Sequence, residues 1–160
     1  GAEGTEISHV LRSIKFMTLD GEVKTYSKSE MVFAYRKTTF PSKGGIVIEA
    51  ELDLEKGDIS DIHREMDKYL SRRGSTQPLT MPNAGSVFKN PAGEKAGRLI
   101  ESAGLKGFRI GGARVSIKHA NFIVNKGGAS AEDVIRLIKH IQTVVEEKSG
   151  IKLEQEIVII

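Results

Sequence analysis

The sequence predicts an α+β fold, in which strands and helices occupy separate runs of the chain. Residues 10–26 and 45–54 alternate apolar and polar side chains, as strands do when one face meets water. The stretches 58–73 and 130–149 instead repeat apolar residues at helical spacing. Short β-type runs lie between and after these two stretches. We therefore expect the helices of the second half to pack against a small sheet.

The first predicted element is a β-hairpin over residues 10–26. Its first run, VLRSIKFMTL, alternates only in part, but Asp20-Gly21 is a strong turn signal before EVKTYS. The turn signal and the two flanking runs together predict two antiparallel strands.

A short helical turn and a third strand are predicted next. Ser27 or Ser29 could cap a helical turn through SEMVFAYR, with Glu30 in its first turn. Residues 45–54 (GIVIEAELDL) alternate apolar and acidic side chains, which predicts a strand with one face in water.

The next element is predicted to be a helix that Asp58 caps and that ends near Arg73, before Gly74. Its charged residues form a solvated face, and its apolar residues share one stripe: Ile62, Met66, Tyr69 and Leu70. Residues 74–84 contain two prolines and no periodicity, so they predict a linker and a domain boundary.

The second half is predicted to mix short strands with two helices. We expect a strand at 86–89, a helix at 94–103 ended by Gly104, an irregular glycine-rich stretch, and strands at 113–118 and 121–125. Ser130 and Asp133 resemble a capping box at the start of the last helix, although Glu is more usual at the later position. That helix ends at Gly150 and carries one apolar face: Val134, Ile138, Ile141 and Val145. The closing LEQEIVII predicts a terminal strand.

Composition excludes several classes of function. The net charge of +3 is evenly spread, and no basic face interleaved with aromatics suggests nucleic acid. Cysteine is absent, which suits a reducing cytoplasm, and the four histidines lack metal-site spacing. No apolar run has membrane-spanning length, and the start is not a signal peptide. An anionic small molecule fits this mildly basic protein better; the oligomeric state stays open.

Polar residues able to do chemistry gather in NAGSVFKNP. Ser86 follows a glycine, and Lys89 with Asn90 could bind phosphate or sugar oxygens. Ser86 to Lys89 also matches an S-x-x-K pattern, but the companion motifs of penicillin-binding enzymes are missing, so we reject that match. A surface turn with polar residues remains an equally open interpretation. The glycines that follow, Gly104 to Gly112, form neither standard nucleotide loop.

Three further residues are candidates on their own. Strand periodicity in LEQEIVII places Glu156 beside a region that turns apolar on both faces, so its carboxyl should have a raised pKa, as a proton donor at neutral pH needs. The alternative is an edge-strand glutamate in water. Arg36 could pair bidentately with a carboxylate or phosphate, and His119 lies at a strand edge. A lone arginine is more often a solvated surface group, and a histidine at a strand edge is usually structural.

Taken together, these segments resemble the UDP-N-acetylenolpyruvoylglucosamine reductases, flavoenzymes of bacterial peptidoglycan synthesis, in their shorter subclass. The likeness covers nearly the whole chain, in the right order: GAEGTEI, FAYR, NAGSVFKNP, AGRLIESAGLKGFRIGGARVS, HANFIVN and LEQEI. Any one of these matches would be weak, and their order makes the resemblance specific.

The resemblance implies roles for the matching residues. Ser86 resembles the proton donor to the substrate, Glu156 a second acid/base residue, and Arg36 the arginine that binds the enolpyruvyl carboxylate. Lys89, Asn90 and His119 become substrate-binding candidates, and Gly1, Ala2 and Gly4 become cofactor-binding ones. The implied reaction passes hydride from NADPH to non-covalently bound FAD and then to UDP-N-acetylglucosamine enolpyruvate, giving UDP-N-acetylmuramate.

The resemblance also implies a division of the chain. Residues 1–75 would be the second half of a flavin-binding lobe, residues 76–149 a substrate-binding domain, and residues 150–160 a terminal strand that returns to the lobe. The family's N-terminal lobe has no counterpart here, so we expect this chain alone to be weakly active or inactive. The alternative is a non-catalytic module that binds a UDP-sugar or phosphate.

Overall fold

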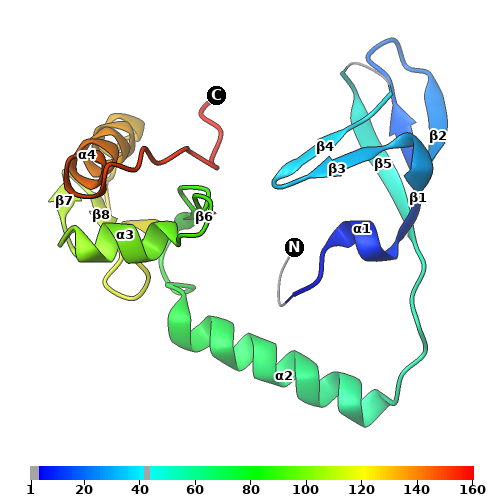
Figure 1. Cartoon of the computed structure of the whole chain (residues 1–160), viewed down its shortest axis with the longest axis horizontal. Helices are drawn as coiled ribbons and strands as arrows, with labels where there is room; N and C mark the ends of the chain where they lie inside the picture. Colours follow the sequence, from blue (N-terminus) through cyan, green and yellow to red (C-terminus); the bar gives the residue numbers. More distant parts are fainter. Residues whose placement is uncertain (1–3, 42–43) are drawn as a thin grey trace. The chain divides into compact units, whose positions relative to one another are not determined.

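The computed structural model describes residues 4–41 and 44–160, which form two compact units (Figure 1). The first unit extends to Asp58 and the second runs from Ile59 to Ile160. This division does not test the domain boundary predicted at residue 76, which stays a prediction.

The first unit is built on a three-stranded antiparallel sheet in the order β2-β1-β5. A short helix, α1 (Ile7–Val10), leads into β1 (Leu11–Met17), which pairs with β2 (Val23–Ser27) and with β5 (Ile46–Leu52). The predicted hairpin is confirmed. Its loop turns where Gly21 adopts a φ of +87°, a conformation that glycine reaches without steric cost.

The predicted helical turn is only partly right. Ser27 precedes a single 3₁₀ turn, η1 (Lys28–Glu30), and its N–H donates to Glu30 Oε2 at 2.8 Å. The rest of SEMVFAYR forms a second hairpin instead, from β3 (Val32–Ala34) and β4 (Lys37–Thr39). A three-residue turn leaves little room for helical periodicity, and the aromatic and β-branched residues that follow favour strands.

The core of the first unit is small. Its buried side chains are Leu11, Ile14, Phe16, Tyr26 and Met31. The strand predicted at 45–54 is confirmed as β5, but the expected contrast between a wet and a dry face is wrong: all seven of its residues are exposed in the described part of the chain. Alternation produces a buried face only where another layer covers the strand.

The second unit begins with α2 (Ile59–Thr76), which confirms the predicted helix but not its end. Gly74 lies inside the helix, and the hydroxyls of Ser75 and Thr76 both donate to Arg72 O. The helix stops just before Pro78, because a proline disfavours helical backbone at the residue ahead of it. The predicted apolar stripe is largely exposed.

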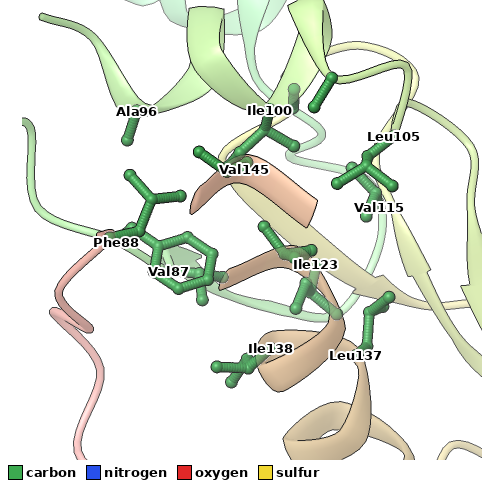
Figure 2. Close-up of a cluster of buried hydrophobic side chains, with 14 of the residues drawn as sticks. Val87, Phe88, Ala96, Ile100, Leu105, Val115, Ile123, Leu137, Ile138 and Val145 are labelled. Carbon is green, nitrogen blue, oxygen red and sulfur yellow. The ribbon is translucent and has the colours of Figure 1, made fainter. Parts of the chain in front are cut away.

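A four-stranded antiparallel sheet in the order β6-β9-β8-β7 forms the centre of the second unit. Its strands are β6 (Asn83–Ser86), β7 (Arg109–Ile110), β8 (Ala113–Val115) and β9 (Phe122–Asn125). Two helices pack with it, α3 (Ala96–Ser102) and α4 (Ala131–Ser149). Figure 2 shows their side chains meeting those of the sheet in one cluster, which includes Ile100, Leu137, Ile138, Val115 and Ile123.

Local signals at the helix ends are confirmed. Gly104 follows α3 with a φ of +78°, and Gly150 caps α4 with a φ of +70°. The Ser130–Asp133 capping box is present: Asp133 N–H donates to Ser130 Oγ, and Ser130 N–H donates to Asp133 Oδ2, both at 3.1 Å.

Several predicted strands differ from those observed. The strand expected at 86–89 lies at 83–86, the one at 113–118 ends at Val115, and β7 was not predicted. The closing segment is not a strand, since it forms one isolated bridge, Phe88 to Gln155, among the described residues. Alternation of apolar residues does not by itself supply the continuous ladder of partner residues that a strand needs.

Candidate functional site

Ser86 lies at the end of β6, where the chain leaves the sheet. It pairs with Phe122 of β9 and is half-buried. Gly85, just before it, has a φ of +80°, and a Cβ added there would meet nothing within 4 Å. The backbone beside the Ser86 hydroxyl is therefore open, as a position that a ligand approaches should be.

The C-terminal segment runs antiparallel beside the residues that follow Ser86. Lys89 N–H donates to Glu154 O at 2.9 Å, and Glu156 N–H donates to Val87 O at 2.8 Å. The backbone of half-buried Glu156 therefore lies beside residues 87–89, which directly follow Ser86. The structure thus brings two of the candidate residues onto adjacent segments, although they are far apart in the sequence.

Lys89 and Asn90 each have a partner within the protein. Lys89 Nζ forms an ion pair with Glu154 Oε1. Asn90 Oδ1 accepts a hydrogen bond from Ala96 N–H at 3.0 Å, which satisfies one of the free donors at the start of α3. A ligand oxygen would have to compete with Glu154 for the Lys89 ammonium.

His119 is half-buried between β8 and β9. Its ring meets Phe122 edge-on at 4.8 Å, and Nδ1 accepts a hydrogen bond from Asn121 N–H at 3.2 Å. Burial lowers the pKa of its imidazole, and the charge of Lys106 adds to that effect. The ring is therefore neutral at pH 7, with its proton on Nε2, and Nε2–H is the group that could donate to a ligand.

Asn121 is a residue of this region that the sequence did not single out. It is 4% exposed, and both ends of its side-chain amide bond the backbone of Phe88. The only signal in the sequence was an amide inside the apolar run HANFIVN. Such a residue needs a buried hydrogen-bond partner, but the run does not show which one.

Arg36 belongs to the first unit, at the tip of the hairpin formed by β3 and β4. Its φ of +55° is the only positive value among the described residues other than glycine, and its guanidinium lies 5.3 Å from the centre of the Tyr35 ring. It lines a hollow of about 200 Å³, whose other lining residues are Glu6, Ile7, Ser8, Phe33, Ala34, Lys37 and Thr38. A larger hollow of about 670 Å³, around His9, Arg12 and Lys28, has none of the predicted site residues in its lining.

The cofactor-binding candidates lie at the start of the chain. Gly1 and Ala2 fall outside the described residues. Gly4 is exposed with a φ of +82°, and no atom lies within 4 Å of an added Cβ.

The described ranges contain neither a metal-binding cluster nor a membrane-spanning helix. Residues 4–41 and 44–160 contain no group of three or more His, Cys, Asp or Glu side chains arranged to hold a metal ion. No helix in those ranges is both long and apolar enough to cross a membrane.

The chain is similar, in sequence and in structure, to proteins of one known family. Residues 77–160 match the family described as UDP-N-acetylenolpyruvoylglucosamine reductase, C-terminal domain. The whole chain is 47% identical to the UDP-N-acetylenolpyruvoylglucosamine reductase of Shouchella clausii, covering 51% of that protein, and 49% identical to that of Oceanobacillus iheyensis, covering 52%. The chain thus spans about half the length of these curated relatives.

A solved structure agrees with these sequence matches. The crystal structure of UDP-N-acetylenolpyruvylglucosamine reductase from Thermus caldophilus superimposes with a TM-score of 0.84 at 38% identity. The match covers 98% of this chain and 55% of that one.

Proposed function

The chain belongs to the UDP-N-acetylenolpyruvoylglucosamine reductase family, and we propose that it carries the proton-transfer and substrate-binding residues of such an enzyme. The proposed reaction reduces the enolpyruvyl group of UDP-N-acetylglucosamine enolpyruvate to give UDP-N-acetylmuramate, a step of peptidoglycan synthesis. The protein would be a flavoenzyme that uses NADPH.

One observation supports this proposal most directly. The backbone of Glu156 is bonded to Val87, the residue next to Ser86, at 2.8 Å. This pairing brings the backbones of Ser86 and Glu156 close together, and we propose that the hydroxyl and the carboxyl act on one substrate. Proton transfer to a substrate carbon needs such donors within hydrogen-bond reach of one position.

Three side chains would have distinct roles in this reaction. Reduction of the enolpyruvyl double bond adds a hydride to one carbon and a proton to its neighbour. Negative charge then builds toward the substrate carboxylate, where the Arg36 guanidinium would stabilise it more than in the ground state. Ser86 would supply the proton from its hydroxyl, and Glu156 would act as the second acid or base.

The substrate-binding candidates would contribute according to the bonds they already make. His119 would donate through Nε2–H, because Nδ1 is occupied by Asn121 N–H. Lys89 would release Glu154 to meet a phosphate oxygen. Asn90 would donate from its side-chain N–H₂ group to a ligand oxygen while its Oδ1 still accepts from Ala96 N–H.

The hollow that contains a predicted site residue, Arg36, has a volume of about 200 Å³, and the hollow of about 670 Å³ contains none of them among the described residues. Pockets that enclose drug-sized ligands span roughly 300–1,000 Å³. We therefore expect this chain alone to bind FAD weakly or not at all. Purified chain that shows a stoichiometric flavin absorption band would contradict this expectation.

The Ser86→Ala substitution in the complete gene product tests the proposal. General acid catalysis contributes about 10²–10⁴-fold in rate, so reduction of the enolpyruvyl substrate should slow by that order while NADPH still reduces the flavin. Ser102→Ala, on the exposed side of α3, is the matched control and should keep full turnover. Equal loss of flavin reduction and turnover in Ser86→Ala would contradict the proton-donor role.

The same assay separates the enzyme from a non-catalytic binding module. Wild-type protein that binds UDP-N-acetylglucosamine enolpyruvate but never reduces it, even with FAD and NADPH present, would favour the module.

A further inference from the structure

We propose that Asn121 is a positioning residue, whose side-chain amide fixes the backbone that carries the Ser86 hydroxyl. The inference rests on the proposed role of Ser86 and adds a residue that acts through it. Asn121 does not itself need to touch the substrate.

The side-chain amide of Asn121 makes the hydrogen bonds to the Phe88 backbone that a neighbouring strand would otherwise make. Its Oδ1 accepts from Phe88 N–H at 2.9 Å, and its Nδ2 donates to Phe88 O at 2.8 Å. Its own backbone carbonyl accepts from Val87 N–H at 2.9 Å. These three bonds hold the two residues that directly follow Ser86.

The opposite edge of this segment is held by the C-terminal segment. There Val87 O accepts from Glu156 N–H, and Lys89 N–H donates to Glu154 O. Without Asn121, Phe88 N–H and C=O would lie buried without these partners, since Phe88 is 1% exposed. Because residues 87–89 are hydrogen-bonded along both edges, the backbone that follows Ser86 is fixed in place.

At neutral pH the amide of Asn121 makes both side-chain bonds. An ionised aspartate accepts but cannot donate to Phe88 O, and a leucine of similar size does neither. Asn121 also donates its backbone N–H to His119 Nδ1. The same residue thus connects the Ser86 segment to the orientation of the His119 ring.

The test uses Asn121→Leu in the complete gene product, with Asn125→Leu as the matched control. Asn125 Oδ1 also accepts two backbone N–H groups, those of Gly127 and Ala129, but at the far end of β9. Misplacing a reacting group by about 1 Å can cost about a hundredfold in rate, so Asn121→Leu should lower kcat by that order. KM and flavin reduction by NADPH should stay within about twofold. Turnover is counted per reducible flavin, so a smaller folded fraction does not mimic the effect.

The Asn121→Asp variant provides a rescue that a purely structural role would not give. Its carboxyl, once protonated, can again both accept from and donate to Phe88. The ratio of this variant's kcat per reducible flavin to that of wild type should therefore rise as the pH falls. Unchanged kcat in folded Asn121→Leu, an equal loss in Asn125→Leu, or a wild-type pH profile in Asn121→Asp would each overturn the inference.

Amide hydrogen exchange keeps this inference separate from the proposed function. If wild-type protein proves to have no reductase activity, the proposed function fails, but the anchor is still measurable in this chain. Phe88 N–H, which donates to Asn121 Oδ1, should exchange faster in Asn121→Leu than in wild type, while Asn125→Leu leaves it protected. Equal protection of Phe88 in all three proteins would show that Asn121 holds nothing.

Discussion

Substitutions of Arg36 should separate the free-energy cost of its left-handed backbone from the contribution of its side chain to turnover. Arg36 holds a left-handed conformation, φ +55°, at a hairpin tip. That conformation costs a residue with a Cβ about 1–2 kcal/mol, while a glycine there loses about 0.5–1 kcal/mol of chain entropy on folding. Both Arg36→Gly and Arg36→Ala lose the contact with the Tyr35 ring, which is worth about 0.5–1 kcal/mol at an exposed site.

The balance predicts an unusual order of stability. Arg36→Gly should be about 0.5–1 kcal/mol more stable than Arg36→Ala, because relief of the strain exceeds the chain entropy that the glycine loses. Both variants lose the contact with the Tyr35 ring, so that loss cancels from the comparison.

The assay must report on the first unit alone, since the two units need not unfold together. Native-state amide exchange at Ile14, a buried residue in the central strand β1, does so. Activity is measured in the complete gene product, where both variants should lose turnover to the same extent. A glycine variant that keeps wild-type turnover would show that Arg36 serves only the turn. An alanine variant as stable as the glycine variant would refute the strain argument.

Three further predictions concern the second unit. Phe88→Ala removes a side chain that is 1% exposed and should cost about 3–5 kcal/mol in urea unfolding. Ser130→Ala removes the N-cap bond to Asp133 N–H and should lower the free energy of unfolding by about 1 kcal/mol, measured from the circular dichroism melt. Ser149→Ala, in the last turn of the same helix, should cost less. Because burial lowers the pKa of His119, the unfolded chain takes up this proton more readily than the folded one. Stability should therefore fall as the pH drops below about 6.5 toward the lower folded pKa, and His119→Gln should flatten that dependence; an equally steep curve in the variant would contradict it.

Features that depend on neighbouring residues were predictable from the sequence. Asp20-Gly21 fixed the first hairpin because the turn needs only its own backbone freedom. The last helix was predicted with both ends because Ser130, Asp133 and Gly150 act within one turn of it. The order and type of most elements followed from such local rules.

Features that depend on distant partners were not predictable. The hairpin at Arg36 is a local exception: Val32–Ala34 pairs with Lys37–Thr39 across Tyr35-Arg36, a turn without the glycine or asparagine that usually signals one. The terminal LEQEIVII alternates like a strand, yet it meets only the short edge beside Phe88. Asn121 escaped notice for the same reason, since its amide bonds a residue on another segment.

The placement of Glu156 can be traced back to the packing of α4. Leu153 is 1% exposed in the core that α4 covers, and its carbonyl accepts from Gln142 Nε2 at 2.9 Å. Leu153 and Gln142 therefore fix where the C-terminal segment starts, and the bonds from residues 154–156 to 87–89 fix where it goes. Loosening either anchor should disturb proton transfer without changing any group that reacts. The positions of the proposed site residues therefore depend on packing in the helical core. The motif residues alone do not fix those positions.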